Sequence, residues 1–332
     1  MMRRYFQCLA DRDAPAALRL CTELVEAGRS PVDVLLDVVA PAQHEVGRRW
    51  AAGEWTVAHE HAATAISESV AIALGARIPQ PDPARGHVVL ACAEREWHGL
   101  PARLVGFALQ EAGWRTTFLG ASTPPTQFAR FLDDADADAV AISCSVAAAL
   151  PAARRMIDAS RETGLPVLVG GGAFGRDDTR AKALGATAWA PDARAAVRAL
   201  ESIAPPPAGP SVNRRAGIDE HAELVLRFAE FRDSARRRWA AVIGEDAATP
   251  LADDALDHAL HSLSAALLTD DSRLLREADE WLSELYSARG GPSCAVPALW
   301  SALRAVVGEP LPEASRHLGL LRQVGRSAPR LI

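Results

Sequence analysis

Two residues near the end of an apolar run could together hold a metal ion. Glu96-Trp97-His98 closely follows the run Val88-Val89-Leu90-Ala91-Cys92. A carboxylate two residues before a histidine can accept one ring N–H, which leaves the other ring nitrogen free to face a metal. We therefore predict that His98 is a metal ligand and that Glu96 orients it. The alternative is that His98 has a structural role, because a single histidine after a strand is more often structural than a metal ligand.

A second set of residues is spaced independently of the first. Trp50 is followed by nine residues and then by Glu60-His61, on a separate helical segment. An aromatic face can stack over a bound group, and a carboxylate can accept hydrogen bonds from hydroxyls. This set could cover the opposite face of the metal. Alternatively, Trp50 is a core residue and Glu60-His61 a solvated helix start, because adjacent helical positions do not point the same way.

The first 78 residues have the apolar spacing of helices, which predicts a helical-bundle cap. Ser30-Pro31 and Thr56 are typical helix starts. Prolines at alternate positions, from Pro79 to Pro83, indicate a linker.

From residue 85 to residue 203 short apolar runs alternate with helical stretches. We predict strands at 87–92, 115–119, 139–143, 167–169 and 187–190, and helices near 100–112, 124–134, 150–163, 178–184 and 192–202. This alternation predicts an α/β domain with a doubly wound parallel sheet of flavodoxin-like type.

Ligands of such sheets bind at the carboxyl ends of the strands. Three predicted strands end near polar or small residues: Glu96, Trp97, His98 and Gly99 after the first, Ser143 and Ser145 at the third, and Gly170, Gly171 and Gly172 at the fourth. The serines could present hydroxyls and the glycines could admit a bulky ligand. The alternative for the glycines is a tight strand-to-helix turn.

Composition excludes several classes of protein. The chain has 332 residues, a net charge of −6, and no basic run beyond Arg236-Arg237-Arg238, which argues against binding nucleic acid directly. Its five cysteines show no metal-binding spacing, which favours a reduced cytoplasm. We find neither a signal peptide nor a stretch able to span a membrane and expect a cytoplasmic protein.

These motifs resemble the cobalamin-binding domain family over about residues 1–203. The family signature is an acid, any residue, His, two residues and Gly, then Ser-x-Ser and Gly-Gly. The resemblance implies that His98 is the lower ligand of cobalt, that Glu96 supports it, and that Ser143, Ser145 and Gly170–Gly172 line the channel for the displaced base. The family's first glycine is replaced by Pro101, so Gly99 would have to supply the flexibility of this loop.

The cap resembles that of CarH-type light sensors, in which Trp and Glu/His enclose an adenosyl group. The resemblance implies adenosylcobalamin, with Trp50, Glu60 and His61 above the cobalt. Those sensors have a histidine directly after the tryptophan, where this chain has Ala51. After photolysis either water becomes the upper cobalt ligand or a histidine of the cap moves in, and we hypothesise that this histidine is His44, His59 or His61.

Beyond the linker Pro205–Pro210, residues 213–327 are predicted to be helical. A cobalamin domain followed by a helical, globin-like domain resembles photocobilins, which imply biliverdin as a second cofactor. Candidate bilin contacts are Arg232, Arg236, His258 and His261, with Cys294 as a candidate attachment point. By default, however, such arginines are surface residues and such cysteines incidental.

The sequence thus predicts a photoreceptor without enzymatic activity, which binds adenosylcobalamin and biliverdin. We expect a homo-oligomer, a dimer or tetramer that depends on light, and an unidentified downstream effector. Two alternatives remain: a corrinoid methyl-carrier protein that serves a methyltransferase, and a cobalamin-binding scaffold with a C-terminal dimerisation domain.

Overall fold

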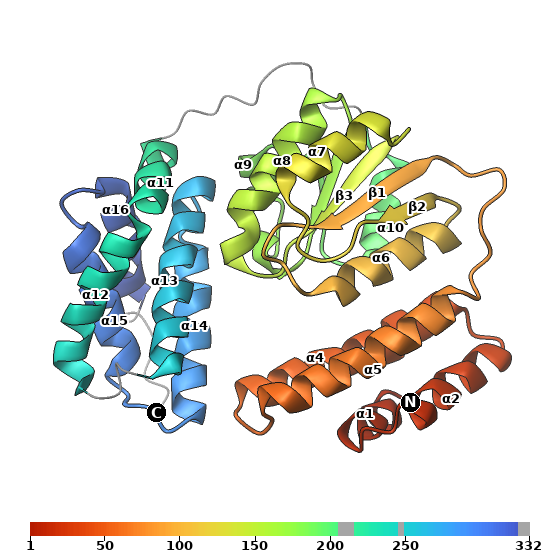
Figure 1. Ribbon diagram of the computed structural model, residues 1–332, viewed down its shortest axis with the longest axis horizontal. Coiled ribbons are helices and arrows are strands. Elements are labelled where there is room, and N and C mark those ends of the chain that lie inside the picture. Colours follow the sequence, from red (N-terminus) through yellow and green to blue (C-terminus); the bar gives the residue numbers. More distant parts are fainter. Residues whose placement is uncertain (205–215, 245–248, 325–332) are drawn as a thin grey trace. The chain divides into compact units, whose positions relative to one another are not determined.

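A five-stranded parallel sheet forms the centre of the first part of the chain (Figure 1). The computed structural model describes residues 1–204, 216–244 and 249–324. The strands follow the order β2-β1-β3-β4-β5. Their bounds are β1 His87–Cys92, β2 Arg115–Phe118, β3 Ala139–Ser143, β4 Val167–Gly170 and β5 Ala188–Ala190. This is the flavodoxin-like order, so the predicted fold class is confirmed.

The carboxyl ends of four strands lie in register. Cys92 at the end of β1 pairs with Ser143, which pairs with Gly170 of β4, which in turn pairs with Ala190 of β5. The loops that follow these strands therefore start from one straight edge of the sheet. β1 is buried along its whole length, as expected for a central strand covered on both faces.

Helices cover both faces of the sheet. Their bounds are α6 Gly99–Glu111, α7 Pro125–Asp134, α8 Leu150–Glu162, α9 Thr179–Leu184 and α10 Ala193–Glu201, with short 3-10 turns at Ala147–Ala149 and Gly172–Phe174. α6 packs against α10 and β1, whereas α7 packs against α8, which contacts β3 and β4. Figure 1 shows α6 and α10 on the face of the sheet that is turned towards the N-terminal helices.

Four helical segments form the cap before the sheet. They are α1 Met2–Ala10, α2 Ala14–Glu26, a continuous helix made of α3 Pro31–Val34, η1 Leu35–Val39 and α4 Ala40–Ala51, and α5 Val57–Gly75. Ser30 and Thr56 cap the predicted helix starts, since their side chains accept hydrogen bonds from Asp33 N and His59 N. Sequence inspection did not single out α1, whose apolar side is short: Tyr5 and Leu9 are its buried residues.

The segment η1 is a π-helical turn, and Pro41 explains its position. Proline has no N–H to bond the carbonyl four residues earlier, and its ring collides with that carbonyl in a regular α-helix. A wider turn before Pro41 relieves both problems without ending the helix.

The cap and the sheet domain share apolar contacts. Leu100 and Leu104 of α6 are buried in the same cluster as the core residues of the cap. Outside this cluster, Arg194 of α10 forms ion pairs with Asp33 (2.7 Å) and Asp37 (3.0 Å) of the cap. These ion pairs are half-exposed, so we expect the apolar contacts to contribute more to stability.

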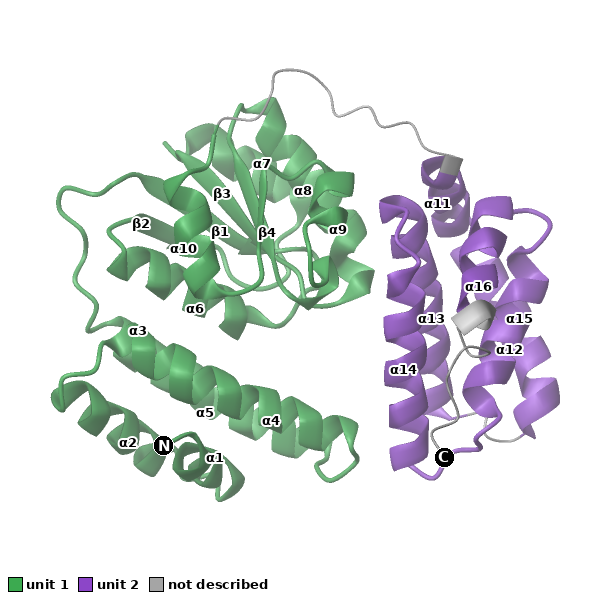
Figure 2. Cartoon of the chain, turned by 180° about the vertical axis from the view of Figure 1, so that it is seen from behind, with its two compact units in different colours: residues 1–210 green, residues 211–332 purple. Residues whose placement is uncertain are grey.

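The chain divides into two compact units, residues 1–210 and residues 211–332, which are coloured separately in Figure 2. The second unit is helical, as predicted. Its described helices are α11 Ala216–Leu226, α12 Phe228–Ile243, α13 Pro250–Thr269, α14 Arg273–Ala288, α15 Ala295–Val307 and α16 Pro312–Val324. Across the described parts of both units, we find no helix with the length and hydropathy needed to cross a membrane.

Candidate functional site

Glu96 and His98 form the predicted pair at the end of β1. One oxygen of Glu96, Oε1, accepts hydrogen bonds from the backbone N–H of His98 (2.8 Å) and from its ring Nδ1 (2.6 Å). A carboxylate only accepts, so Nδ1 carries the proton and Nε2 of neutral His98 has its lone pair available. This is the tautomer that a metal ligand requires.

The other oxygen of Glu96 ties the same loop to the end of β3. Oε2 accepts hydrogen bonds from the backbone N–H groups of Ser145 and of Val146 (3.1 Å for the latter). Glu96 is fully buried. Burial by itself raises the pKa of a carboxyl group, but the hydrogen bonds from His98 and Ser145 outweigh this effect and lower the pKa of Glu96. The carboxylate is therefore a fixed, charged anchor for His98.

The imidazole of His98 is open on its other side, since 60% of the side chain is exposed. The hydrogen bond with Glu96 raises the pKa of His98, burial opposes this change, and the charges of Glu96 and Glu60 add to it. The contribution of Glu60 is informative, because this residue belongs to the cap helix α5. The charge of Glu60 therefore acts on His98 across the boundary between the cap and the sheet domain.

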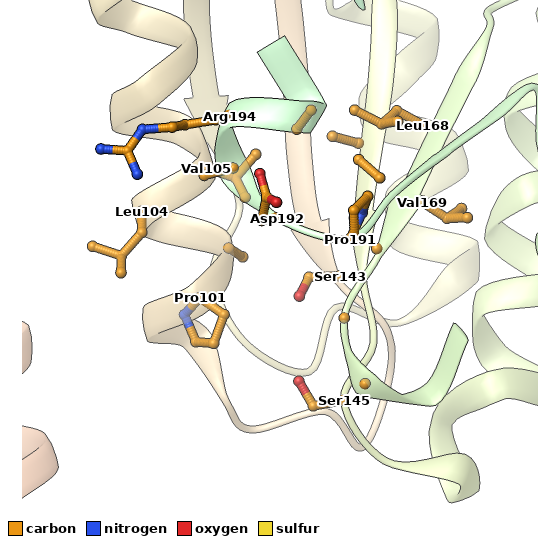
Figure 3. A pocket seen from close by; sticks show the side chains of 18 of the residues that line it. Pro101, Leu104, Val105, Ser143, Ser145, Leu168, Val169, Pro191, Asp192 and Arg194 are labelled. Carbon is orange, nitrogen blue, oxygen red and sulfur yellow. The ribbon is translucent and has the colours of Figure 1, made fainter. Parts of the chain in front are cut away.

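A cavity of about 700 Å³ extends from the cap into the sheet domain. It is lined on the cap side by Leu36, Ala40, Pro41 and His44, and on the sheet side by Ser143, Ser145, Gly170, Gly171 and Gly172, among others. Figure 3 shows Ser143 and Ser145 across the cavity from Pro101 of α6. The cavity continues between α6, α10 and the strands, where Val105, Leu168 and Ala196 make it apolar.

The three glycines line this cavity with their backbone. A Cβ on Gly171, whose φ is 99°, would collide with the carbonyl group of Cys144, and a Cβ on Gly170 would come within 2.9 Å of the Ala190 oxygen. These positions need glycine because the β4 loop runs close to its neighbours. The tight-turn explanation therefore holds for Gly170 and Gly171.

Pro101, the departure from the family signature, does not disturb the loop. α6 begins at Gly99, so Pro101 lies in the first helical turn, where backbone N–H groups have no partner within the helix. Its ring lines the cavity. Trp97, in the loop before α6, is 73% exposed and is available to contact a bound group.

In the cap, Glu60 belongs to a chain of hydrogen bonds that the sequence did not reveal. Thr64 donates to Glu60 Oε1 (2.7 Å), and Gln43 of α4 donates to Thr64. His61 bonds the other oxygen of Glu60 through Nδ1 (2.6 Å), and its side chain is 73% exposed. Glu60 and His61 therefore point differently, as their adjacent positions suggested. Trp50 is half-buried near the end of α4.

The three candidate upper ligands occupy different environments. His44 lines the cavity together with Ala40 and Pro41. His59 completes the capping box of α5, because its Nδ1 accepts a hydrogen bond from the backbone N–H of Thr56 (3.3 Å) and also contacts Thr56 Oγ1 (2.7 Å). His61 is engaged with Glu60. Of the three, His44 faces the cavity.

The four candidate bilin contacts lie along two antiparallel helices of the second unit. Arg236 pairs with Asp253, Arg232 pairs with Asp253 (2.8 Å) and Asp257, and His261 stacks on Phe228 at 4.8 Å between ring centroids. His258 lies against Trp281 of α14 at 4.6 Å. The arginines thus already have carboxylate partners. Cys294 is exposed, directly before α15.

Two stretches of the first unit match known protein families. Residues 86–201 and residues 1–74 each match a family described as a B12 binding domain. The chain is 29% identical to the HTH-type transcriptional repressor CarH of Myxococcus xanthus over 164 residues, which cover 48% of this chain and 54% of that protein. It therefore spans about half the length of this curated relative.

One solved structure supports the same fold for the first unit. The monomethylamine corrinoid protein of Methanosarcina barkeri superposes with a TM-score of 0.53 at 19% identity, over 60% of this chain and 97% of that one. A cobalamin-binding protein of Desulfitobacterium hafniense has a TM-score of 0.33 at 18% identity over 60% and 97%. The two domain matches, at residues 1–74 and 86–201, indicate a cobalamin-binding protein, and the chain is similar to CarH over about half of its length.

Proposed function

We propose that this cobalamin-binding protein is a light sensor, not an enzyme, and that its cofactor is adenosylcobalamin. The observation that carries the proposal is the position of Glu60. This carboxylate belongs to the cap, acts electrostatically on His98, and stands ten residues after Trp50, at the spacing of CarH-type caps. A cap with this acceptor suits an upper ligand that has hydroxyl groups.

The residues of the site fit such a cofactor. His98 would hold cobalt from below through Nε2, with Glu96 fixing the ring by accepting from Nδ1. The cavity behind Ser143 and Ser145 would take the displaced base, since its inner walls are apolar and its rim offers two hydroxyls. When bound, adenosylcobalamin supplies a cobalt–carbon bond that light can break.

The contacts of the cap residues would then depend on whether the adenosyl group is present. Glu60 would accept hydrogen bonds from ribose hydroxyls, and Trp50 would shelter the nucleoside. Without the nucleoside, these side chains lose their contacts and the packing of the cap can change. We expect the signal to leave as a change in the oligomeric state of the chain, because a switch needs an element with two packings.

His44 is the residue that we expect above the cobalt in the light. It stands where the cavity meets the cap, whereas His59 and His61 are held by Thr56 and Glu60. Ala51 cannot serve, because it has no ligating group.

We further propose biliverdin as a cofactor of the second unit, along α13. His258 and His261 lie on this helix beside Trp281 and Phe228, which offer flat surfaces to a bilin. Bilin propionates would have to displace Asp253 and Asp257 from Arg232 and Arg236, an exchange of one carboxylate for another.

One experiment tests both parts of the proposal. The protein is incubated in the dark with adenosylcobalamin, with methylcobalamin, or with adenosylcobalamin and biliverdin, and freed of unbound cofactor. Absorption spectra and light-scattering masses are recorded before and after illumination. We expect bound adenosylcobalamin, a spectral change in green light accompanied by a change in mass, and a separate far-red band from biliverdin.

The outcomes separate the alternatives. Stable binding of methylcobalamin with no preference for the adenosyl form would favour a methyl carrier and overturn the light sensor. Light-dependent spectra without a biliverdin band would leave a single-cofactor sensor and reject the bilin. No change in mass would reject signalling through oligomeric state.

A further inference from the structure

We propose that Gln43 is a specificity-determining residue, whose amide oxygen recognises the amino group of the nucleoside on the upper face of the cofactor. This inference rests on the proposed function, because it assumes a nucleoside beneath the cap. It assigns to a specific side chain the choice between an adenine base and upper ligands that lack a hydrogen-bond donor.

The hydrogen bonds of the cap fix which way the Gln43 amide faces. Glu60 can only accept, so Thr64 must donate its hydroxyl proton to Glu60 Oε1. The Thr64 oxygen then accepts from Gln43, and the Gln43 atom in this contact must be the donor Nε2. The order Gln43 to Thr64 to Glu60 is therefore determined by chemistry, and the carbonyl oxygen Oε1 of Gln43 is left on the other side of the amide.

That oxygen is an acceptor without a donor among the described residues. Gln43 Oε1 is buried, and no described group hydrogen-bonds to it. A buried polar atom in this state costs free energy, and such atoms in native proteins usually have a reason. A donor from a bound ligand would satisfy it.

The position of Gln43 on α4 is suited to this role. Ala40, one turn earlier, and His44, the next residue, both line the cavity. Gly47 and Trp50 follow Gln43 at i+4 and i+7 and so share its side of the helix. A Cβ on Gly47 would meet no atom within 4 Å. The surface at Gly47, which is exposed, therefore lies open on the same side of α4 as Gln43 and Trp50.

The ligand that fits is a purine nucleoside with an exocyclic amine. Stacked on Trp50, with its ribose hydroxyls on Glu60, it would need an acceptor for the amine, and Gln43 Oε1 is the buried acceptor bonded into the same network. A methyl or aqua ligand offers nothing that spans this distance. Hypoxanthine, which has an oxygen in place of the amine, would place one acceptor against another.

The test compares two nucleosides that differ in this one group. Dissociation constants for adenosylcobalamin and for 5′-deoxyinosylcobalamin are measured in the dark by spectral titration of the full-length protein. For the wild type we expect about tenfold tighter binding of the adenosyl form, the effect of one unsatisfied buried polar group. Gln43→Met should remove this ratio, so that both forms bind alike.

The ratio of the two dissociation constants distinguishes recognition of the amino group from stacking of the base and from partial loss of folding. Trp50→Ala removes the surface on which the base would stack and leaves the contact between Gln43 and Thr64 in place, so it should weaken both nucleosides equally and keep the tenfold ratio. Gln7→Met is the matched control, because Gln7 is also helical but bonds only Asp11 among the described residues, and it should leave both constants unchanged. A variant that folds in part lowers both apparent affinities but not their ratio.

Two results would overturn the inference. Equal dissociation constants of the wild type for the two cobalamins would mean that no acceptor in the protein recognises the amino group. A tenfold ratio that persists in Gln43→Met assigns the recognition to another residue. Either can occur while the dark-bound adenosyl form still responds to light, so failure here is distinct from failure of the light sensor, which shows as no light-dependent change in any variant.

Discussion

The first unit contains two pairs of histidine and glutamate with the same geometry and different surroundings. His98 and His61 each bond a glutamate oxygen through Nδ1 at 2.6 Å. Glu96, however, is fully buried and accepts three further backbone hydrogen bonds, whereas 24% of the Glu60 side chain is exposed. The contact distance does not distinguish the pairs. What distinguishes them is the number of backbone groups that hold the carboxylate, which makes one pair a rigid support and the other an adjustable one.

Replacing each histidine by alanine is the strongest test of this contrast. We expect His98→Ala to weaken cobalamin binding by roughly 100-fold or more, since loss of a supporting residue alone often costs 10–100-fold. His61→Ala should change the affinity by less than about threefold, because its ring is mostly exposed. Spectral titration with hydroxocobalamin, which has no nucleoside, measures both. Equal losses would mean that the two pairs are equivalent.

The glutamates provide the next test. Glu96→Gln replaces a carboxylate oxygen by an amide N–H₂, which cannot accept hydrogen bonds from the N–H groups around it. We therefore expect the free energy of unfolding to fall by about 1–3 kcal/mol. The affinity for cobalamin should fall roughly 10–100-fold. Glu60→Gln should leave stability unchanged and affect only the adenosyl form. Thermal melting and titration with adenosyl- and hydroxocobalamin report the two effects. Glu96→Gln with wild-type stability would contradict a rigid support.

Among the residues that the structure describes, a third histidine, His258 of α13, pairs with no carboxylate, and its pKa is shifted in the opposite direction. Burial lowers the pKa of His258 to about 4, and nearby His261 adds to this. Above pH 6.5 the ring is neutral in both folded and unfolded chains. Between pH 6.5 and 4 mainly the unfolded chain takes up the proton, so we expect the second unit to lose up to about 3 kcal/mol of stability.

Melting curves across this pH range, with His258→Gln as the comparison, measure the effect. The variant has no titrating ring, so its stability should fall less between pH 6.5 and 4. Parallel curves for the two proteins would show that His258 is not kept neutral by burial.

The smallest expected effect concerns the cap histidines. His44→Ala should leave dark binding of adenosylcobalamin near the wild-type level but alter the absorption spectrum after illumination, because His44 lines the cavity. His59→Ala, the matched control, should keep the wild-type light spectrum and lose about 1 kcal/mol of stability with its capping box. If His59→Ala instead alters the absorption spectrum after illumination, His59 must leave Thr56 in the light and become the upper ligand itself.

Local patterns in the sequence were sufficient for much of the fold. All five strands were predicted within one residue of their bounds, because apolar runs and the turns between them carry that information. The pair Glu96 and His98 was visible for the same reason, as its partners are two residues apart.

Contacts between distant segments could not be predicted in this way. Glu96 reaches Ser145 and Val146 across 49 and 50 residues, and Gln43 reaches Thr64 between two cap helices. Arg232 and Arg236 were predicted from the sequence as bilin contacts, but both pair with Asp253. This pairing depends on the antiparallel placement of α12 and α13. No local spacing specifies such pairs.

The shared core of cap and sheet domain has a practical consequence for dissecting this protein. Leu100 and Leu104 start only two residues after His98, yet their side chains belong to the cap's apolar cluster. A fragment limited to residues 86–201 would bring both leucines into water on the very helix that carries the metal ligand. Such a fragment would tend to self-associate, and its oligomeric state would say little about signalling in the whole chain.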